Sequence, residues 1–101
     1  MTLQKRAMQI VSCHFEEQGF NVLDVSKGKK KEKSQHLGYD LLAEKQVEVL
    51  RIEVKKCENL WQIPDLYETE FDSDRRLVAD RLCIVYFGEE LPRLCVIKRD
   101  D

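Results

Sequence analysis

Three ionisable residues, Asp40, Glu53 and Lys55, occur in segments that otherwise have the composition of core strands. Asp40 follows Gly38 and Tyr39, and Glu53 and Lys55 lie two residues apart in the run "RIEVK". Two carboxylates held close together need a cation, and a divalent ion such as Mg²⁺ or Mn²⁺ prefers oxygen ligands. A nearby ammonium suits phosphodiester hydrolysis, because it offsets charge that develops on the phosphorus oxygens. All three are candidate catalytic residues, with Asp40 and Glu53 as candidate metal ligands.

A predicted hairpin brings the two carboxylates together. Strands are expected over about 38–43 and 49–56, and the short gap between them leaves room only for a turn. If the chain folds symmetrically about Gln46 and Val47, Asp40 faces Glu53 across the ladder. The same register pairs Leu41 with Ile52, Leu42 with Arg51 and Ala43 with Leu50. Side chains alternate between the faces of a strand, so the charged residues Asp40, Arg51, Glu53 and Lys55 are expected on one face, opposite the aliphatic ones.

A second interpretation fits the same hairpin. A strand with Glu-x-Lys on its outer face is common, and Arg51 and Lys55 are placed to neutralise the two carboxylates. In that case the protein is a catalytically inactive module that binds nucleic acid or a partner protein. Binding of Mg²⁺ or Mn²⁺ distinguishes the two interpretations.

The remaining elements follow from hydrophobic spacing and turn residues. A helix is expected from Leu3 onwards, with Thr2 as its N-cap and Gly19 as its stop. Strands are expected over 20–25, 82–87 and 93–98, and one or two short helices between 64 and 80, where Pro64 suits a first helical position. This order predicts an α/β sandwich with a mixed central sheet of about five strands flanked by helices.

Size and composition limit the protein further. The 101 residues are 43% hydrophobic and 36% charged, which predicts one domain over 1–101. There is no apolar run long enough to cross a membrane and no signal-peptide core at the N-terminus, so we expect a cytoplasmic protein without membrane contact. Four separate cysteines and only two histidines favour free thiols over a zinc site, and Cys83 and Cys95 are expected to be buried. A net charge of −2 restricts any nucleic-acid binding to a local surface.

That surface is predicted in the segment "SKGKKKEKSQH" over 26–36, which has the composition of a solvated, mobile loop. Its lysines are candidate phosphate contacts: Lys27, Lys29, Lys30, Lys31 and Lys33. A merely solubilising loop is an equally good interpretation. His36 is expected to be exposed and His14 to lie in or beside the core. Trp61 and Tyr67 could stack on bases, but packing between helix and sheet is the favoured use.

With these motifs, the chain resembles the PD-(D/E)XK nuclease superfamily, and most closely the domain at the C-terminal end of the plant protein NO VEIN. The resemblance covers nearly the whole chain through Ala7-Met8, Val11, Gly19, "DVS" at 24–26, "LGYDLL" at 37–42, "RIEVK" at 51–55 and "CIVYF" at 83–87. It implies a restriction-endonuclease-like fold, a DNA or RNA substrate, metal ligation by Asp40 and Glu53, and Lys55 as the catalytic lysine. It also implies an acid on the first helix, for which Glu16 and Glu17 are the candidates. A homodimer or larger assembly through the edge of the last strand is a further expectation.

Overall fold

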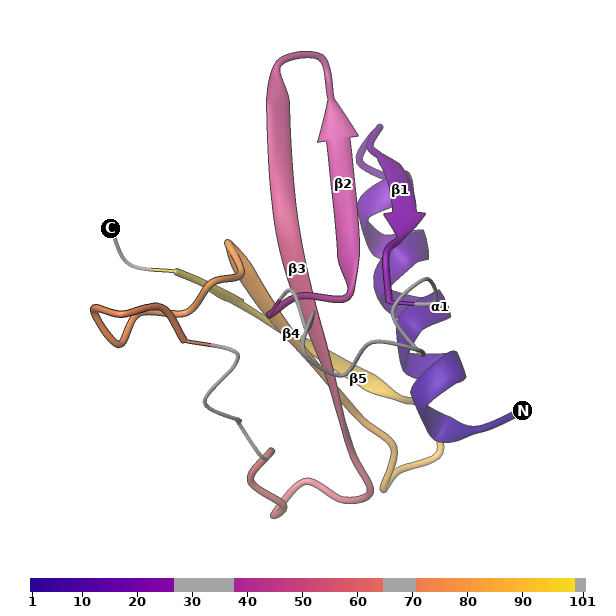
Figure 1. The fold of residues 1–101 in the computed structure, drawn as a ribbon. Coiled ribbons are helices and arrows are strands. Elements are labelled where there is room, and N and C mark those ends of the chain that lie inside the picture. The colour runs from indigo at the N-terminus through magenta and orange to yellow at the C-terminus, as the bar shows by residue number, and fades with distance from the viewer. Residues whose placement is uncertain (27–37, 65–70, 100–101) are drawn as a thin grey trace.

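The computed structural model describes residues 1–26, 38–64 and 71–99. The elements are α1 (Leu3–Glu16), β1 (Asn21–Asp24), β2 (Leu41–Lys45), β3 (Glu48–Cys57), β4 (Arg81–Tyr86) and β5 (Arg93–Lys98). The strands form one five-stranded sheet in the order β1-β2-β3-β4-β5. The β3 and β4 strands are parallel and the other neighbours are antiparallel, so the sheet is mixed. The protein is thus a small α/β domain in which α1 lies beside the sheet (Figure 1).

The helix α1 begins and ends where its sequence predicts. The backbone N–H of Lys5 donates to Oγ1 of Thr2 at 3.2 Å, which satisfies one of the amides left over at a helix N-terminus. After the last turn, Gly19 has a φ of +95°, in the left-handed region that glycine adopts most easily. The N-cap and the stop at Gly19 are both confirmed.

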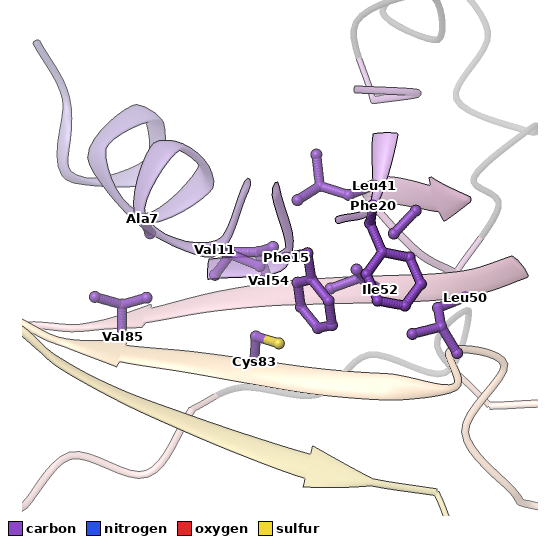
Figure 2. Close-up of a cluster of buried hydrophobic side chains, with 11 residues drawn as sticks. Ala7, Val11, Phe15, Phe20, Leu41, Leu50, Ile52, Val54, Cys83 and Val85 are labelled. Carbon is purple, nitrogen blue, oxygen red and sulfur yellow. The ribbon is translucent and has the colours of Figure 1, made fainter. Parts of the chain in front are cut away.

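The core lies between α1 and one face of the sheet. Ala7, Val11 and Phe15 recur every four residues along α1 and are buried. They point toward aliphatic side chains of the strands (Figure 2). The sheet side of this cluster consists of Leu41, Ala43, Leu50, Ile52, Val54, Cys83 and Val85. Burying one such side chain contributes roughly 1.5–3 kcal/mol, so this cluster fixes which face of each strand turns toward α1.

The β2–β3 hairpin has the predicted register. Leu41 pairs with Ile52, Leu42 with Arg51 and Ala43 with Leu50. Gln46 and Val47 form the turn, and Gln46 takes the positive φ of 55° that a tight hairpin turn requires. The predicted β4–β5 hairpin is confirmed as well.

The helical segment expected over 64–80 is wrong for residues 71–80, whereas 65–70 lie outside the described residues. Phe71 and Leu77 form an isolated antiparallel bridge around a turn. The side chain of Asp72 accepts hydrogen bonds from the backbone N–H groups of Asp74 and Arg76, at 2.9 and 3.0 Å. These bonds lower the pKa of Asp72, the bond from Arg76 most strongly. Aspartate thereby stabilises a turn in place of a helix.

The cysteines are free thiols, as expected, but their burial differs from the prediction at one position. Cys57 and Cys83 are buried, and burial raises the pKa of the Cys83 thiol to about 12. Cys95, in contrast, is exposed, because β5 is an edge strand. None of the described residues forms a helix with the length and apolar composition that a membrane crossing requires.

Candidate functional site

Asp40 lies beside Glu53, next to the end of the β2–β3 ladder. The backbone N–H of Asp40 donates to the carbonyl of Ile52 at 2.8 Å. Its Oδ2 accepts a hydrogen bond from the backbone N–H of Val54 at 2.9 Å. Asp40 is therefore bonded to both residues that flank Glu53, one on each side. Asp40 itself precedes β2, and the β2–β3 register starts one residue later, at Leu41 and Ile52.

Glu53 is a buried charged residue on β3, with only 3% of its surface exposed. Lys55 follows two residues later on the same face, and its Nζ lies 3.7 Å from Oε2 of Glu53. The Lys55 side chain is itself only 13% exposed. Side chains buried to this extent stay ionised when an opposite charge or a metal ion pairs with them, because transfer of an ion out of water costs several kcal/mol.

This pair faces away from α1. Ile52 and Val54 belong to the core under α1, and the residues that alternate with them on β3 project from the opposite face. On that opposite face Cys57 packs with Leu82 and Ile84 of β4 in a second buried cluster. The parallel register places Glu53 beside Leu82 and Lys55 beside Ile84. An apolar strand thus flanks the two charges on one side, which strengthens electrostatic interactions between them.

The alternative interpretation placed Arg51 and Lys55 beside the carboxylates of Asp40 and Glu53; Lys55 does contact Glu53, whereas the guanidinium of Arg51 contacts Asp80. Its Nε lies 3.2 Å from Oδ2 of Asp80, and its backbone N–H donates to the same oxygen at 2.8 Å. Arg99 contacts Oδ1 of Asp80 at 3.3 Å and also donates to the carbonyl of Leu77 at 3.1 Å. We call Arg51, Asp80 and Arg99 the Asp80 network.

The Asp80 network was missed by reasoning from the sequence. Its members come from β3, the residue before β4 and the residue after β5, so no local spacing links them. Burial by itself raises the pKa of Asp80, but hydrogen bonds from the side chain and backbone of Arg51, together with the charges of Arg51 and Arg99, outweigh it and lower that pKa. The hydrogen bond to Asp80 likewise raises the pKa of Arg51. The network holds the 71–80 segment against the sheet.

The donor set at Asp40 and Glu53 fits a hard divalent cation. Both side chains offer carboxylate oxygens, and Mg²⁺ commonly binds one or two protein carboxylates while keeping waters and phosphate oxygens. The hydrogen bond from Val54 uses one of the roughly four lone-pair positions of the Asp40 carboxylate and fixes its orientation. Within the described ranges, no group of three or more His, Cys, Asp or Glu residues is arranged to hold a metal. A metal here would therefore rely on two protein carboxylates.

The helix acids do not join this site. Glu16 and Glu17 are exposed at the end of α1, which covers the face of the sheet opposite to Glu53. Glu16 instead lines a cavity of about 850 Å³ together with Asp24 and Ser26. The implied acid on the first helix thus has no counterpart near Glu53 among the described residues.

The remaining predicted site residues are the lysines of the 26–36 segment, the two histidines, Trp61 and Tyr67, and the structure describes only some of them. Lys27, Lys29, Lys30, Lys31, Lys33, His36 and Tyr67 lie outside the described residues. His14 is half-buried, contacts the ring of Phe15 and hydrogen-bonds Gln18 at 2.9 Å, as expected for a boundary residue. Trp61 is 92% exposed, so its expected packing between helix and sheet is wrong.

Comparisons of the chain with protein-family models, curated proteins and solved structures gave no match.

Proposed function

We propose that the protein is a nuclease-like domain with a restriction-endonuclease-like fold, and that it hydrolyses phosphodiester bonds of DNA or RNA. Asp40 and Glu53 hold Mg²⁺ or Mn²⁺, and Lys55 is the catalytic lysine. The observation that carries the proposal is the position of Asp40, bonded to both neighbours of Glu53, with the Lys55 ammonium 3.7 Å from Glu53. The resemblance of "GYD" and "RIEVK" to the PD-(D/E)XK pattern supports the same assignment.

The residues have separate roles in this mechanism. A bound divalent ion would polarise the phosphate and lower the pKa of a coordinated water. Asp40, just before β2, and Glu53, on β3, would supply negative oxygens to the ion, and the hydrogen bond from Val54 holds the Asp40 carboxylate in place. Lys55 presents a positive charge on the same face as Glu53, where it can offset charge growing on the phosphorus oxygens. The flanking apolar strand β4 limits the screening of these charges by water.

The proposal predicts metal binding that depends on Asp40. In calorimetric titrations with MgCl₂ or MnCl₂, Asp40→Asn should weaken binding by at least about tenfold, because one ligand loses its charge. Asparagine keeps an oxygen that can accept from the Val54 amide, so folding should be retained. Glu48→Gln is the matched control, since it removes an exposed carboxylate from the same hairpin and should leave binding unchanged.

Cleavage tests the role of Lys55. The wild type should cleave at least one form of nucleic acid when metal is present, and Lys55→Met should reduce the rate roughly 10²- to 10³-fold. Removing one charge of a buried pair also lowers stability, by roughly 3–5 kcal/mol. Thermal unfolding is therefore measured alongside, and Lys55→Arg keeps the positive charge in a folded protein. Metal-independent cleavage, or full activity of a folded Lys55→Met protein, would contradict the mechanism.

A second candidate function is a module that binds nucleic acid or a partner protein without catalysis. It is favoured by the pairing of Glu53 with Lys55 and by the exposure of Trp61, the one tryptophan of the chain. Trp61 fluorescence provides the discriminating measurement. Quenching by oligonucleotides in the presence of EDTA, without metal binding by the wild type, would support this module in place of the nuclease.

A further inference from the structure

The strand β5 is an edge strand of the sheet in the part of the chain that the structure describes. Among the described strands, β5 pairs only with β4, and it runs for six residues from Arg93 to Lys98. Its four central residues, Leu94 to Ile97, carry no charge. Val96 is 39% and Ile97 41% exposed. Proteins usually protect such an edge with a central charge, a proline or a bulge, because unpaired backbone groups there recruit another strand.

The direction of the outward backbone groups restricts what can pair with β5. The N–H of Arg99 donates to the carbonyl of Asp80, so position 99 points toward β4. The N–H and C=O groups of successive residues alternate between the two edges of a strand, so those of residues 93, 95 and 97 also point toward β4. Positions 94, 96 and 98 then direct their N–H and C=O groups outward.

When the β5 strands of two copies pair antiparallel, two registers bring their outward N–H and C=O groups together. In each register, five residues of one strand lie opposite five residues of the other. One is centred on Val96 and the other on Cys95. The register centred on Val96 places Leu94 opposite Lys98 of the other copy, and Arg93 opposite Arg99. Like charges directly opposite each other are destabilising.

The register centred on Cys95 avoids this repulsion. Leu94 faces Val96 of the other copy, and Arg93 faces Ile97. Leu94 already packs against the core under α1, so the pairing of Leu94 with Val96 extends that apolar layer across the two-fold axis. Arg93 is also partly neutralised by Glu89, 3.2 Å away. The edge is therefore complementary to itself, which suits an isologous dimer.

We propose that two copies of this chain associate through antiparallel pairing of their β5 strands, centred on Cys95, to form a continuous ten-stranded sheet. The amide of Val96 and the carbonyl of Leu94 of the other copy bond across the interface, and the same bond recurs by symmetry. The proposal is independent of the nuclease function, because β5 carries none of the candidate catalytic residues.

Sedimentation velocity over a concentration series tests the pairing. The wild type should show a concentration-dependent dimer. Val96→Pro removes an outward N–H while the positions bonded to β4 stay intact, so the protein should remain folded by circular dichroism. It should raise the dimer dissociation constant roughly 10- to 100-fold, because two hydrogen bonds are lost. Val96→Ala is the matched control, because it keeps the N–H and should dimerise far better than Val96→Pro.

Cross-linking tests the register. Opposed residues at a non-hydrogen-bonded antiparallel position have Cα atoms about 4.5 Å apart, which lies within the range of disulfides. In a Cys13→Ser background, oxidation by copper phenanthroline in air should join two chains through Cys95, and the added Cys95→Ser change should abolish the product. A monomer at every concentration, a dimer insensitive to Val96→Pro, or cross-linking of Val96→Cys in place of Cys95 would each overturn the proposal.

Discussion

At the scale of single residues, Asp80 is a carboxylate that connects distant segments of the chain. It accepts from the backbone and guanidinium of Arg51, and Arg99 contacts its other oxygen. Asp80 therefore joins the middle of the sheet to the end of β5. The ion pair of Glu53 with Lys55 differs from this network, because both of its members belong to β3.

The lowered pKa of Asp80 makes stability depend on pH. The folded pKa is below the unfolded value of about 3.9, so the stabilising contribution is complete above that value and is lost as pH falls through the folded pKa. The free energy of unfolding, measured by urea denaturation between pH 7 and pH 2, should fall in this acidic window. Asp80→Asn should flatten the fall and cost about 1–3 kcal/mol at pH 7, because charged hydrogen bonds are lost.

Asp74→Asn provides the control for Asp80. Asp74 is exposed and pairs only with the exposed side chain of Arg76 in the described residues. Its substitution should change the free energy of unfolding by no more than about 0.5 kcal/mol. An equal loss in both variants at pH 7 would show that the Asp80 network contributes nothing specific.

At the scale of elements, α1 and the β2–β3 hairpin are specified by their own residues. The repeat of Ala7, Val11 and Phe15 gives α1 one buried stripe, and Thr2 and Gly19 mark its limits. The 71–80 segment shows the opposite case. Pro64 predicted the start of a helix in this region, but the side chain of Asp72 bonds the backbone amides of Asp74 and Arg76 and produces a turn.

The N-cap of α1 gives a test at this scale. Thr2→Ala should lower the free energy of unfolding by about 0.5–2 kcal/mol, because the Lys5 amide loses its acceptor. Thr2→Ser keeps a hydroxyl at the same position and should behave nearly as the wild type. Chemical denaturation monitored by circular dichroism measures both. If alanine and serine have the same effect, the hydroxyl does not contribute to capping.

At the scale of the whole molecule, one sheet separates two environments. The face under α1 holds the main core, and the other face carries Glu53 and Lys55 beside a smaller cluster at Cys57, Leu82 and Ile84. The candidate site thus shares its strand with the core, since Ile52 and Val54 alternate with the two charges. Stability and any site chemistry depend on the same register of β3.

Shortening a buried side chain of β3, on the face that packs against α1, tests this assignment of the core. Ile52→Ala should cost about 2–5 kcal/mol, because Ile52 is fully buried and its removal leaves a cavity. Val47→Ala, at the exposed hairpin turn, should be nearly neutral. Calorimetric melting should show a fall in Tm of roughly 4–8 °C for each kcal/mol. Equal melting temperatures for the two variants would contradict this assignment of the core.

The sequence by itself determined the helix, the five strands and the β2–β3 register, because hydrophobic period, caps and a short turn act over a few residues. It also predicted Asp40 opposite Glu53, because a hairpin with one buried face admits a single register, and in the structure Asp40 bonds Ile52 and Val54 on either side of Glu53. Only the tertiary structure decided that Arg51 bonds Asp80, 29 positions away, and that β3 and β4 run parallel. Both features depend on how the connection between β3 and β4 places segments that are distant in the sequence. The local spacing of residues does not predict that placement.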